Sequence, residues 1–324
     1  MKEKDKNGFY KKKQVRMKHE ISNTNYHNDK RLYTSLSKIF SDSNHFKMKV
    51  FEQYVSWVGI ETHSFCNRKC AFCQNSYIDR HSATIYMPEQ MYSKIINELA
   101  LINYKGLICY SGYNEPLAHR VILYKLREAR EKLPNAILFT STNGDFVTRE
   151  YLDELAYAGM NRMRIMRYPL LDEEYSTDKQ MQVLIEFAHK LKLKYEKVNS
   201  SRLRLLHHEL YLEVISEDLK KMVNNRAGSV DLFRNEQGVT LRKEPCRAPF
   251  TECYVRYDGS VNPCCATRPD VVEQKDMIMG NVSSETLFDI YTSFKWSLLR
   301  YQMKDYGEQK VFPCSVCNDY TRQF

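Results

Sequence analysis

The chain has 324 residues, of which 43% are hydrophobic and 12% aromatic, a composition typical of a globular protein. This length is enough to bury an enzyme-sized core in one or two domains. No stretch approaches 18 consecutive apolar residues, and the charged N-terminus lacks the apolar stretch of a secretory signal. We therefore expect a cytoplasmic protein without a membrane span.

The net charge of +9 is concentrated near the N-terminus. Residues 1–50 contain 13 Lys and Arg but 5 Asp and Glu, whereas the rest of the chain is nearly neutral. We interpret this segment as a solvated basic extension with a helix over 32–40. The alternative is an arm that binds an acidic partner, such as nucleic acid or an acidic peptide.

Downstream of Phe51 the pattern alternates between short apolar runs, which predict strands, and apolar residues at helical spacing, which predict helices. Thr148 is the expected N-cap of its helix. The predicted strands are 55–60, 106–110, 136–140, 162–167, 203–206 and 210–215, and a hairpin is expected over 253–261. The predicted helices are 88–103, 120–132, 148–158 and 178–191.

Strands that alternate with helices of this length predict βαβ units and a parallel sheet in an α/β fold, either doubly wound or barrel-like. In such folds the functional residues follow the carboxyl ends of the strands. The segments 66–73, 111–116 and 142–144 each follow one of the first three predicted strands. We therefore expect these three segments to form one site.

The chain contains ten cysteines, and in a reducing compartment metal ligation is a more probable role for them than disulfides. Cys66, Cys70 and Cys73 follow the first strand with the spacing C-x3-C-x2-C. Three thiolates can hold three irons of a cubane and leave the fourth iron open, whereas four thiolates would saturate it. Zinc sites usually take four ligands in paired spacings, which fits this run poorly.

These segments resemble the radical S-adenosylmethionine superfamily. The matching residues are Cys66, Cys70 and Cys73 with the aromatic Phe72, a G-x-x-E-P segment within 111–116, and 142–144. The resemblance implies a partial (βα)6-type parallel barrel in which the open iron chelates S-adenosylmethionine. It also implies that reductive cleavage of this cofactor yields a 5′-deoxyadenosyl radical, which abstracts a hydrogen atom from the substrate.

The resemblance further implies which residues hold the cofactor. Glu115 is expected to accept a hydrogen bond from the methionine ammonium, and Gly112 to allow close approach of the backbone. Asn143 is a further expected contact, although its Asn-Gly pair alone would indicate a turn. Arg167, at the end of the fourth strand, is a candidate to hold the cofactor carboxylate. No catalytic acid or base is assigned.

A second set of cysteines lies near the C-terminus, at Cys246, Cys264, Cys314 and Cys317. The Asp258-Gly259 turn folds the chain back between the first two, and a C-x2-C pair supplies the others. Four thiolates suffice to saturate a [4Fe–4S] cluster and also suffice for zinc, so the spacing alone leaves both alternatives open.

Residues 246–281 resemble the C-terminal extension called SPASM, whose shortened form, twitch, holds one auxiliary [4Fe–4S] cluster. The chain has no cysteine after Cys317, which favours the twitch form. The resemblance implies that the four cysteines of the second set are the ligands, with Cys264 preferred over Cys265 because of its spacing from Gly259. Cys109 and Cys253 lie in strand-like runs and are expected to be small core residues.

Three parts are therefore predicted: a basic extension (1–50), a radical S-adenosylmethionine partial barrel (51–240), and a cysteine-rich hairpin and helix domain for the auxiliary cluster (241–324). A saturated second cluster has no iron for substrate, so its expected role is electron transfer or structure. A net two-electron oxidation needs such an acceptor and is the favoured outcome. The resemblance implies dehydrogenation of a small cyclic alcohol or amino sugar, or modification of a peptide.

Two alternatives remain at this point: a redox-neutral peptide epimerase or maturase, and a non-catalytic metal-binding protein that engages RNA. The second leaves the Glu115 segment unexplained. The expected partners are the substrate and an electron donor such as flavodoxin or ferredoxin, with no membrane and no nucleic acid. Residues 202–213 and 224–228 are candidates for the substrate pocket. His207 and His208 are candidates for proton transfer, although exposed or core histidines are more common.

Overall fold

The computed structural model describes residues 43–168, 176–216, 225–230, 241–268, 270–304 and 310–319. Most of the basic extension, including the helix expected over 32–40, lies outside these residues, as does residue 224 of the predicted substrate pocket. Within the described part of the chain, no helix has the length and apolar character needed to cross a membrane.

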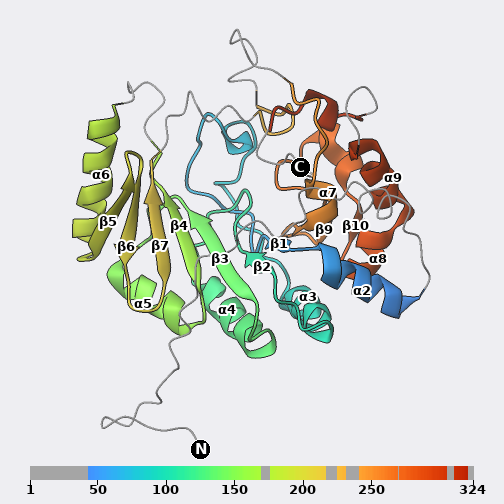
Figure 1. Ribbon diagram of the computed structural model, residues 1–324, viewed down its shortest axis with the longest axis horizontal. Coiled ribbons are helices and arrows are strands. Elements are labelled where there is room, and N and C mark those ends of the chain that lie inside the picture. Colours follow the sequence, from blue (N-terminus) through green and yellow to red (C-terminus); the bar gives the residue numbers. More distant parts are fainter. Residues whose placement is uncertain are drawn as a thin grey trace, which may run out of the picture.

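One mixed sheet organises the described residues, in the order β10-β9-β8-β1-β2-β3-β4-β7-β6-β5 (Figure 1). Among them, six central strands run parallel, and an antiparallel pair extends the sheet at each edge. The parallel strands are β1 (Trp57–Ile60), β2 (Leu107–Cys109), β3 (Ile137–Thr142), β4 (Arg162–Met166), β7 (Tyr211–Ile215) and β8 (Glu252–Val255). The edge strands are β5 (Lys194–Asn199), β6 (Arg202–Leu206), β9 (Ser260–Asn262) and β10 (Gly280–Asn281).

Helices connect the successive parallel strands and lie side by side along the sheet, with α3 packed on α4 and α4 on α5 (Figure 1). These crossover helices are α3 (Glu89–Leu101), α4 (Val121–Lys132), α5 (Arg149–Tyr157) and α6 (Thr177–Lys190). The remaining helices gather beside the C-terminal strands: α2 (Asn44–Tyr54), α7 (Ala248–Thr251), α8 (Leu287–Thr292) and α9 (Phe294–Met303). Short 3-10 helices are η2 (Gln74–Ser76), η4 (Val272–Met277) and η5 (Cys314–Val316).

The predicted α/β class with a parallel sheet is confirmed, and the predicted strands and crossover helices appear within a few residues of their expected bounds. The expected N-cap also forms, since the Thr148 side chain accepts a hydrogen bond from the backbone N–H of Tyr151 at 3.1 Å. Strand β5 was not predicted. Almost all of its residues are exposed at the edge of the sheet, so it lacks the apolar alternation that indicates a strand.

The C-terminal part of the chain adds directly to the sheet. Strand β8 pairs in parallel with β1, and the predicted hairpin joins β8 to β9. Gly259 adopts a φ of +83° in this turn, a conformation that glycine tolerates best. The predicted boundary near residue 240 borders 231–240, which lie outside the described residues, and the division into domains stays a prediction.

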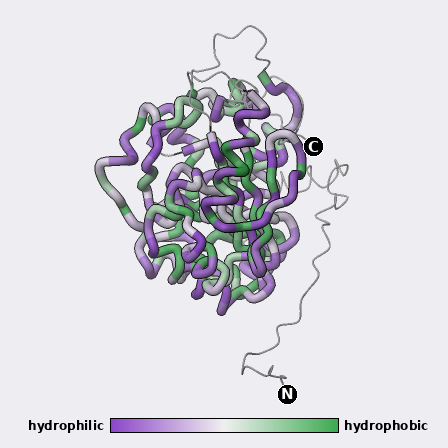
Figure 2. Tube along the Cα trace, turned by 90° about the vertical axis from the view of Figure 1, so that its left-hand side faces the viewer, coloured by the Kyte–Doolittle hydropathy of each residue, from purple (hydrophilic) through white to green (hydrophobic). Residues whose placement is uncertain are grey.

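One contiguous apolar core extends from the crossover helices to the C-terminal helices. Figure 2 shows hydrophobic segments gathered in the middle of the molecule, with hydrophilic segments towards the outside. Phe51 of α2 illustrates the continuity, because its ring contacts both Phe288 and Tyr291 of α8 at 5.3 Å between centroids. The two ends of the described chain are therefore packed together.

Candidate active site

A cavity of about 380 Å³ lies at the carboxyl ends of the parallel strands. The loops that follow β1, β2 and β3 contribute to its wall, together with residues from the C-terminal part of the chain. The predicted site residues that line it are Cys66, Cys70, Cys73, Gly112, Glu115 and Asn143. The three segments that were expected to form one site thus border the same cavity.

The first cysteine set occupies the loop after β1. The backbone N–H of Cys73 donates to the carbonyl of Cys70 at 2.8 Å, and all three thiols are half-buried. Burial is the main cause that raises the pKa of Cys66 to about 11 and that of Cys70 to about 12, and the neighbouring thiols raise both further. Bare thiolates are therefore costly here, and a bound iron cluster removes that cost, so this donor set fits a cluster.

Glu115 joins the ends of β2 and β3. Its carboxylate accepts hydrogen bonds from the backbone N–H of Leu117 (3.1 Å), the hydroxyl of Thr142 (2.5 Å) and the backbone N–H of Asn143 (2.8 Å). Burial raises the pKa of this carboxyl group, and the three hydrogen bonds oppose that rise. The carboxylate is thus fixed at the cavity wall, and its contact with a cofactor ammonium stays a prediction.

Gly112 allows a close approach within the protein itself. A methyl group at this position would lie 2.6 Å from Cγ of the buried Glu61. The Glu61 carboxylate in turn accepts a hydrogen bond from the backbone N–H of Tyr113 at 2.6 Å. A larger residue at 112 would therefore displace the side chain that holds this segment in place.

Asn143 links the end of β3 to the cysteine loop, because its amide donates to Asn67 at 2.8 Å. Arg167 donates to the carbonyl of Asn143 at 3.2 Å and pairs with Asp145 at 3.3 Å. Among the described residues that line the cavity, Arg167 is absent. Its guanidinium supports Asn143, and its predicted contact with a cofactor carboxylate stays untested.

A buried network ties the C-terminal part of the chain to the cavity wall. The guanidinium of Arg268 lies 4.3 Å from the ring centroid of Tyr113 and donates to Asn75 at 3.0 Å. Asn75 donates to the carbonyl of Tyr113 at 2.8 Å, and the Tyr113 hydroxyl donates to the carbonyl of Ala266 at 3.1 Å. Arg268 also forms an ion pair with Asp270. Burial raises the pKa of Asp270, but Arg268 and Arg80 lower it more strongly, to about 2.

The four cysteines of the second set share one site. Burial raises the pKa of Cys314 well above its ordinary value, and the charges of Cys264, Cys246 and Cys317 raise it further. Cys246 and Cys317 are buried, and the other two are half-buried. As in the first set, bare thiolates would repel one another here, and a bound cluster would remove that cost. The second set therefore also fits a cluster.

The adjacent cysteines 264 and 265 have different surroundings. Cys264 lies with the second set, whereas Cys265 lines the cavity. Cys109 is buried at the end of β2 as expected, and it also borders the cavity, with its sulfur 3.1 Å from the Ser111 hydroxyl. The separation of the two neighbours agrees with the choice of Cys264 as the ligand, which remains a proposal.

Several cavity residues were not singled out in the sequence. They come from the interior and both ends of strands, from the segment after β4 and from the loop at 225–230, so the rule that sites follow the carboxyl ends of strands would have found only some of them. None of the residues 202–213 lines the cavity. Of the predicted segment 224–228, Arg226 is a lining residue. The unpredicted lining residues include Trp57, Arg164, Met166, Tyr168 and Tyr254.

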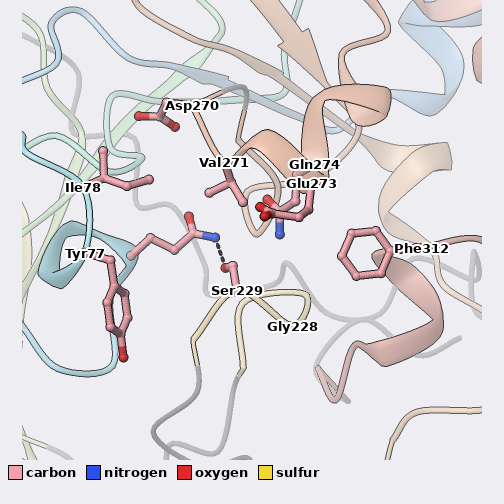
Figure 3. Close-up of a pocket in the computed structure, with 10 residues that line it drawn as sticks. Tyr77, Ile78, Gly228, Ser229, Asp270, Val271, Glu273, Gln274 and Phe312 are labelled. Atoms are coloured by element: carbon pink, nitrogen blue, oxygen red, sulfur yellow. Dashed lines mark hydrogen bonds between the residues drawn. The ribbon is translucent and has the colours of Figure 1, made fainter.

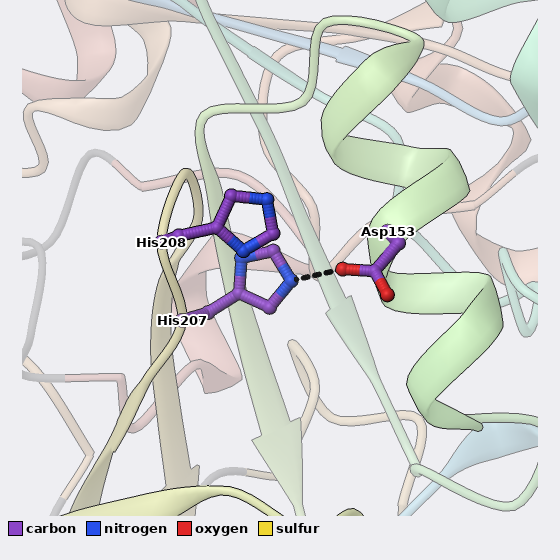
Figure 4. Close-up of side chains that lie close together, drawn as sticks. All are labelled: Asp153, His207 and His208. Atoms are coloured by element: carbon purple, nitrogen blue, oxygen red, sulfur yellow. Dashed lines mark hydrogen bonds and ion pairs between the residues drawn. The ribbon is translucent and has the colours of Figure 1, made fainter. Parts of the chain in front are cut away.

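His207 and His208 lie in the turn before β7, where His207 points toward Asp153 of α5 (Figure 4). Because this turn precedes β7, it lies at the end of the parallel strands away from the cavity. His207 donates through Nε2 to Asp153 at 3.0 Å, because its Nδ1 accepts the backbone N–H groups of Glu209 and Leu210, each at 3.2 Å. This tautomer leaves His207 no lone pair for a metal ion. Neither His207 nor His208 lines the cavity, so a role of these histidines in proton transfer stays a prediction that the cavity lining does not support.

A second cavity, of about 510 Å³, lies between the segment that follows the cysteine loop, residues 228–229 and the C-terminal part of the chain (Figure 3). Apolar side chains such as Tyr77, Ile78 and Phe312 contribute most of its wall, and Gln74 donates a hydrogen bond to Ser229 across one side. None of the predicted ligands or cofactor contacts lines this cavity. The cavity at the strand ends is therefore the one that carries the candidate chemistry.

Comparison with known proteins gives two family matches. Residues 60–166 match the radical SAM superfamily, and residues 246–318 match the iron–sulfur cluster-binding domain SPASM. The first match spans the cysteine loop and the ends of β2 and β3, and the second spans all four cysteines of the second set.

Two curated proteins and one solved structure are similar along most of the chain. The chain is 25% identical to the S-adenosyl-L-methionine-dependent 2-deoxy-scyllo-inosamine dehydrogenase of Niallia circulans, over 84% of this chain and 96% of that protein. It is 23% identical to the tungsten-containing aldehyde ferredoxin oxidoreductase cofactor-modifying protein of Pyrococcus furiosus, over 81% and 88%.

The solved structure is that of BtrN in complex with AdoMet and 2-DOIA, with a TM-score of 0.63 and 21% identity over 83% of this chain and 95% of that one. This likeness shows that the two chains share a fold. The cysteine sets, the cavity and the family matches lead to one conclusion: the chain belongs to the radical S-adenosylmethionine superfamily and carries a C-terminal SPASM-type domain for an auxiliary iron–sulfur cluster.

Proposed function

We propose that this enzyme oxidises an alcohol carbon of a small cyclic polyol or amino sugar. Cys66, Cys70 and Cys73 would hold the cluster that binds S-adenosylmethionine, and Cys246, Cys264, Cys314 and Cys317 would hold the auxiliary cluster. The observation that carries the proposal is the position of Cys265, which lines the same cavity as the first cysteine set. Its neighbour Cys264 belongs to the second set, so the second set lies close to the wall of the reaction cavity.

Oxidation of an alcohol to a ketone removes a hydrogen atom, a further electron and a proton. When bound, S-adenosylmethionine and its cluster supply the radical that takes the hydrogen atom, and the auxiliary cluster supplies an acceptor for the electron. The proton can leave to water, because the exposed side chain of Arg164 forms part of the cavity wall. A redox-neutral reaction would leave the nearby second set without a role in electron transfer.

The size and lining of the cavity support a compact polar substrate. Its volume of about 380 Å³ lies near the lower end for small-molecule sites. Arg226 and Arg164 supply donors for hydroxyl oxygens, and Tyr168, Tyr254 and Trp57 supply aromatic surface for a sugar-like ring. The related enzyme of Niallia circulans is named for the dehydrogenation of an aminocyclitol, which belongs to this class.

The remaining contacts of the proposed site follow from the same geometry. Glu115, Gly112 and Asn143 would hold the cofactor beside the first cysteine set, while Arg167 would support Asn143 through its carbonyl group.

A flavodoxin or ferredoxin would supply the electron that cleaves the cofactor. The barrel would span 51–240 and the auxiliary-cluster domain 241–324.

The test uses the full chain, reconstituted with iron and sulfide without oxygen, and supplied with S-adenosylmethionine and dithionite. Candidate aminocyclitols and cyclic polyols are offered with deuterium on each alcohol carbon in turn. We expect deuterium in 5′-deoxyadenosine and one ketone per 5′-deoxyadenosine formed. Recovery of an epimerised alcohol without ketone would overturn the oxidation, and turnover of peptides alone would overturn the substrate class.

A further inference from the structure

Arg242 is a buried cation with two donor atoms that no described residue accepts. Its side chain is 3% exposed, and neither Nε nor Nη1 has a hydrogen-bond partner among the described residues. A buried donor without a partner destabilises the folded protein, and more so when it is charged. One explanation for such a group in a folded protein is an acceptor outside the polypeptide, such as a bound group or a water molecule.

The guanidinium lies against the second cysteine set. Its charge interacts with Cys246, Cys317 and Cys314, and its side chain hydrogen-bonds to Cys246. The backbone N–H of Arg242 donates to the carbonyl of Cys317 at 2.9 Å, which fixes the residue beside the C-x2-C pair. The two unused donors are thus held next to the four thiols.

Two other charged side chains, Lys310 and Asp319, lie near this set. Lys310 is also buried, but its Nζ donates to the backbone carbonyls of Arg242 (2.9 Å) and Glu244 (2.5 Å), so it supports the loop that carries the arginine. Asp319 supplies an opposing negative charge near Cys317, and its backbone N–H donates to the Cys317 sulfur at 3.4 Å. Among the described residues of this group, Arg242 is the cation with side-chain donors that have no partner.

We propose that Arg242 sets the reduction potential of the auxiliary cluster by donating hydrogen bonds to its sulfur atoms and by placing a positive charge beside it. This inference rests on the proposed ligand set of four cysteines. The potential of an iron–sulfur cluster depends on nearby charge, on hydrogen bonds to sulfur and on burial. Each reduction adds one negative charge, which a buried guanidinium stabilises, so Arg242 makes the cluster a better electron acceptor.

The consequence concerns the direction of the reaction. A substrate radical reaches the ketone only if its extra electron has a favourable acceptor. A buried cation beside the second cysteine set lowers the free energy of that acceptor's reduced form. Arg242 would therefore favour oxidation over return of the electron to the substrate.

The experiment compares three substitutions in the full reconstituted chain. Arg242→Gln and Arg242→Met remove the charge, and Arg242→Lys keeps it without the planar fork of donors. Arg300→Gln is the matched control, because Arg300 is also fully buried in the C-terminal part and also has one donor, Nη1, without a partner among the described residues. Its charge, however, interacts with Tyr291 and Cys253 and not with the second cysteine set. For each protein we would measure iron per chain, the melting temperature and the auxiliary-cluster potential by EPR-monitored redox titration.

We expect the neutral variants to shift the redox equilibrium at least tenfold towards the oxidised cluster, which equals about 59 mV for one electron. Arg242→Lys should restore most of the potential, and Arg300→Gln should lower the melting temperature without a shift. An unchanged potential in a neutral variant that retains its auxiliary iron would overturn the inference. Loss of that iron from both neutral variants would also overturn it, because Arg242 would then serve assembly. A wild-type chain with only four irons would instead overturn the proposed ligand set.

Discussion

The two cysteine sets of this molecule are built in opposite ways. The first lies within one short loop after β1, its three thiols are half-buried, and all three border a cavity. The second is collected from residues 246–317 by a hairpin, a pair of helices and a 3-10 helix, and two of its four cysteines are buried. The first set is therefore open towards a ligand, whereas the second is closed around its own donors.

This difference shows how one chain can separate two tasks of iron–sulfur chemistry. A set with three thiolates and an adjacent cavity leaves an iron available to a cofactor. A set with four thiolates, supported by a buried arginine, suits a cluster that only exchanges electrons. The network of Arg268, Asn75 and Tyr113 joins the two regions, so each helps to hold the other in place.

The largest effect on cofactor cleavage is expected when a ligand of the first, open cysteine set is removed. Cys70→Ala should abolish formation of 5′-deoxyadenosine, because a cluster held by two thiolates would not bind and cleave the cofactor. Cys253→Ala is the control, since this thiol is fully buried in β8 and belongs to neither set. Chromatography of the anaerobic reaction mixture gives the answer, and undiminished 5′-deoxyadenosine from the Cys70 variant would contradict the assignment.

A substitution in the second, closed cysteine set should leave S-adenosylmethionine cleavage in part but abolish product formation. Cys264→Ala should lose about four irons per chain and all ketone product while retaining some 5′-deoxyadenosine. Cys265→Ala, one residue away, should keep the iron because this thiol faces the cavity. Iron analysis and product quantification on the two variants provide the comparison. Loss of iron from the Cys265 variant alone would reverse the assignment of the two neighbours.

The pH dependence of stability should reveal a buried neutral histidine next to the open set. Burial, and then the charge of His119, lowers the pKa of His63 to about 4 from an ordinary value of 6.5. Below pH 6.5 the unfolded chain therefore takes up a proton on His63, whereas the folded chain does so only near pH 4. The free energy of unfolding falls as the pH falls from 6.5 to about 4. The loss attributable to His63 between pH 7 and pH 5 is about 2 kcal/mol.

Urea unfolding of the apoprotein at the two pH values measures this loss. His63→Gln should reduce the drop by about 2 kcal/mol, whereas His208→Gln, exposed in the turn before β7, should leave it unchanged. Equal drops in the wild type and the His63 variant would show that this histidine titrates normally.

The smallest effect is expected away from both sets. Thr148→Ala removes the N-cap of α5 and should lower the free energy of unfolding by about 1 kcal/mol, with no change in cofactor cleavage by the folded enzyme. Thr148→Ser keeps the hydroxyl and should retain most of the stability. A loss of 5′-deoxyadenosine from the alanine variant at a temperature where it is folded would show that this cap does more than stabilise a helix.

The comparison of the two regions also explains what the sequence could predict. The α/β class, the crossover helices and the first cysteine set were accessible because their signals are local: helical spacing, strand runs and C-x3-C-x2-C. The hairpin at Asp258-Gly259 was predicted for the same reason. Strand β5 was not, because its exposed residues carry no apolar pattern.

Long-range relations that no local motif marks could not be predicted from the sequence. Pairing of β8 with β1 joins residues almost 200 positions apart, and it brings Tyr254 to the cavity. The role of Glu61 beneath Gly112 and that of Asp145 between Arg68 and Arg167 depend on side-chain directions that only the fold sets. Arg242 is the clearest case, since an arginine in a loop gives no sign that its donors will be buried and unused.

The most direct test of the account is a combined measurement on the full chain, purified and reconstituted without oxygen. Iron and sulfide content are determined together with 5′-deoxyadenosine formed from S-adenosylmethionine and a reductant. The account predicts about eight irons per chain, two cubanes, and 5′-deoxyadenosine that depends on the reductant. Zinc in place of iron, with no 5′-deoxyadenosine, would contradict the central claim that this chain holds one open and one closed iron–sulfur cluster.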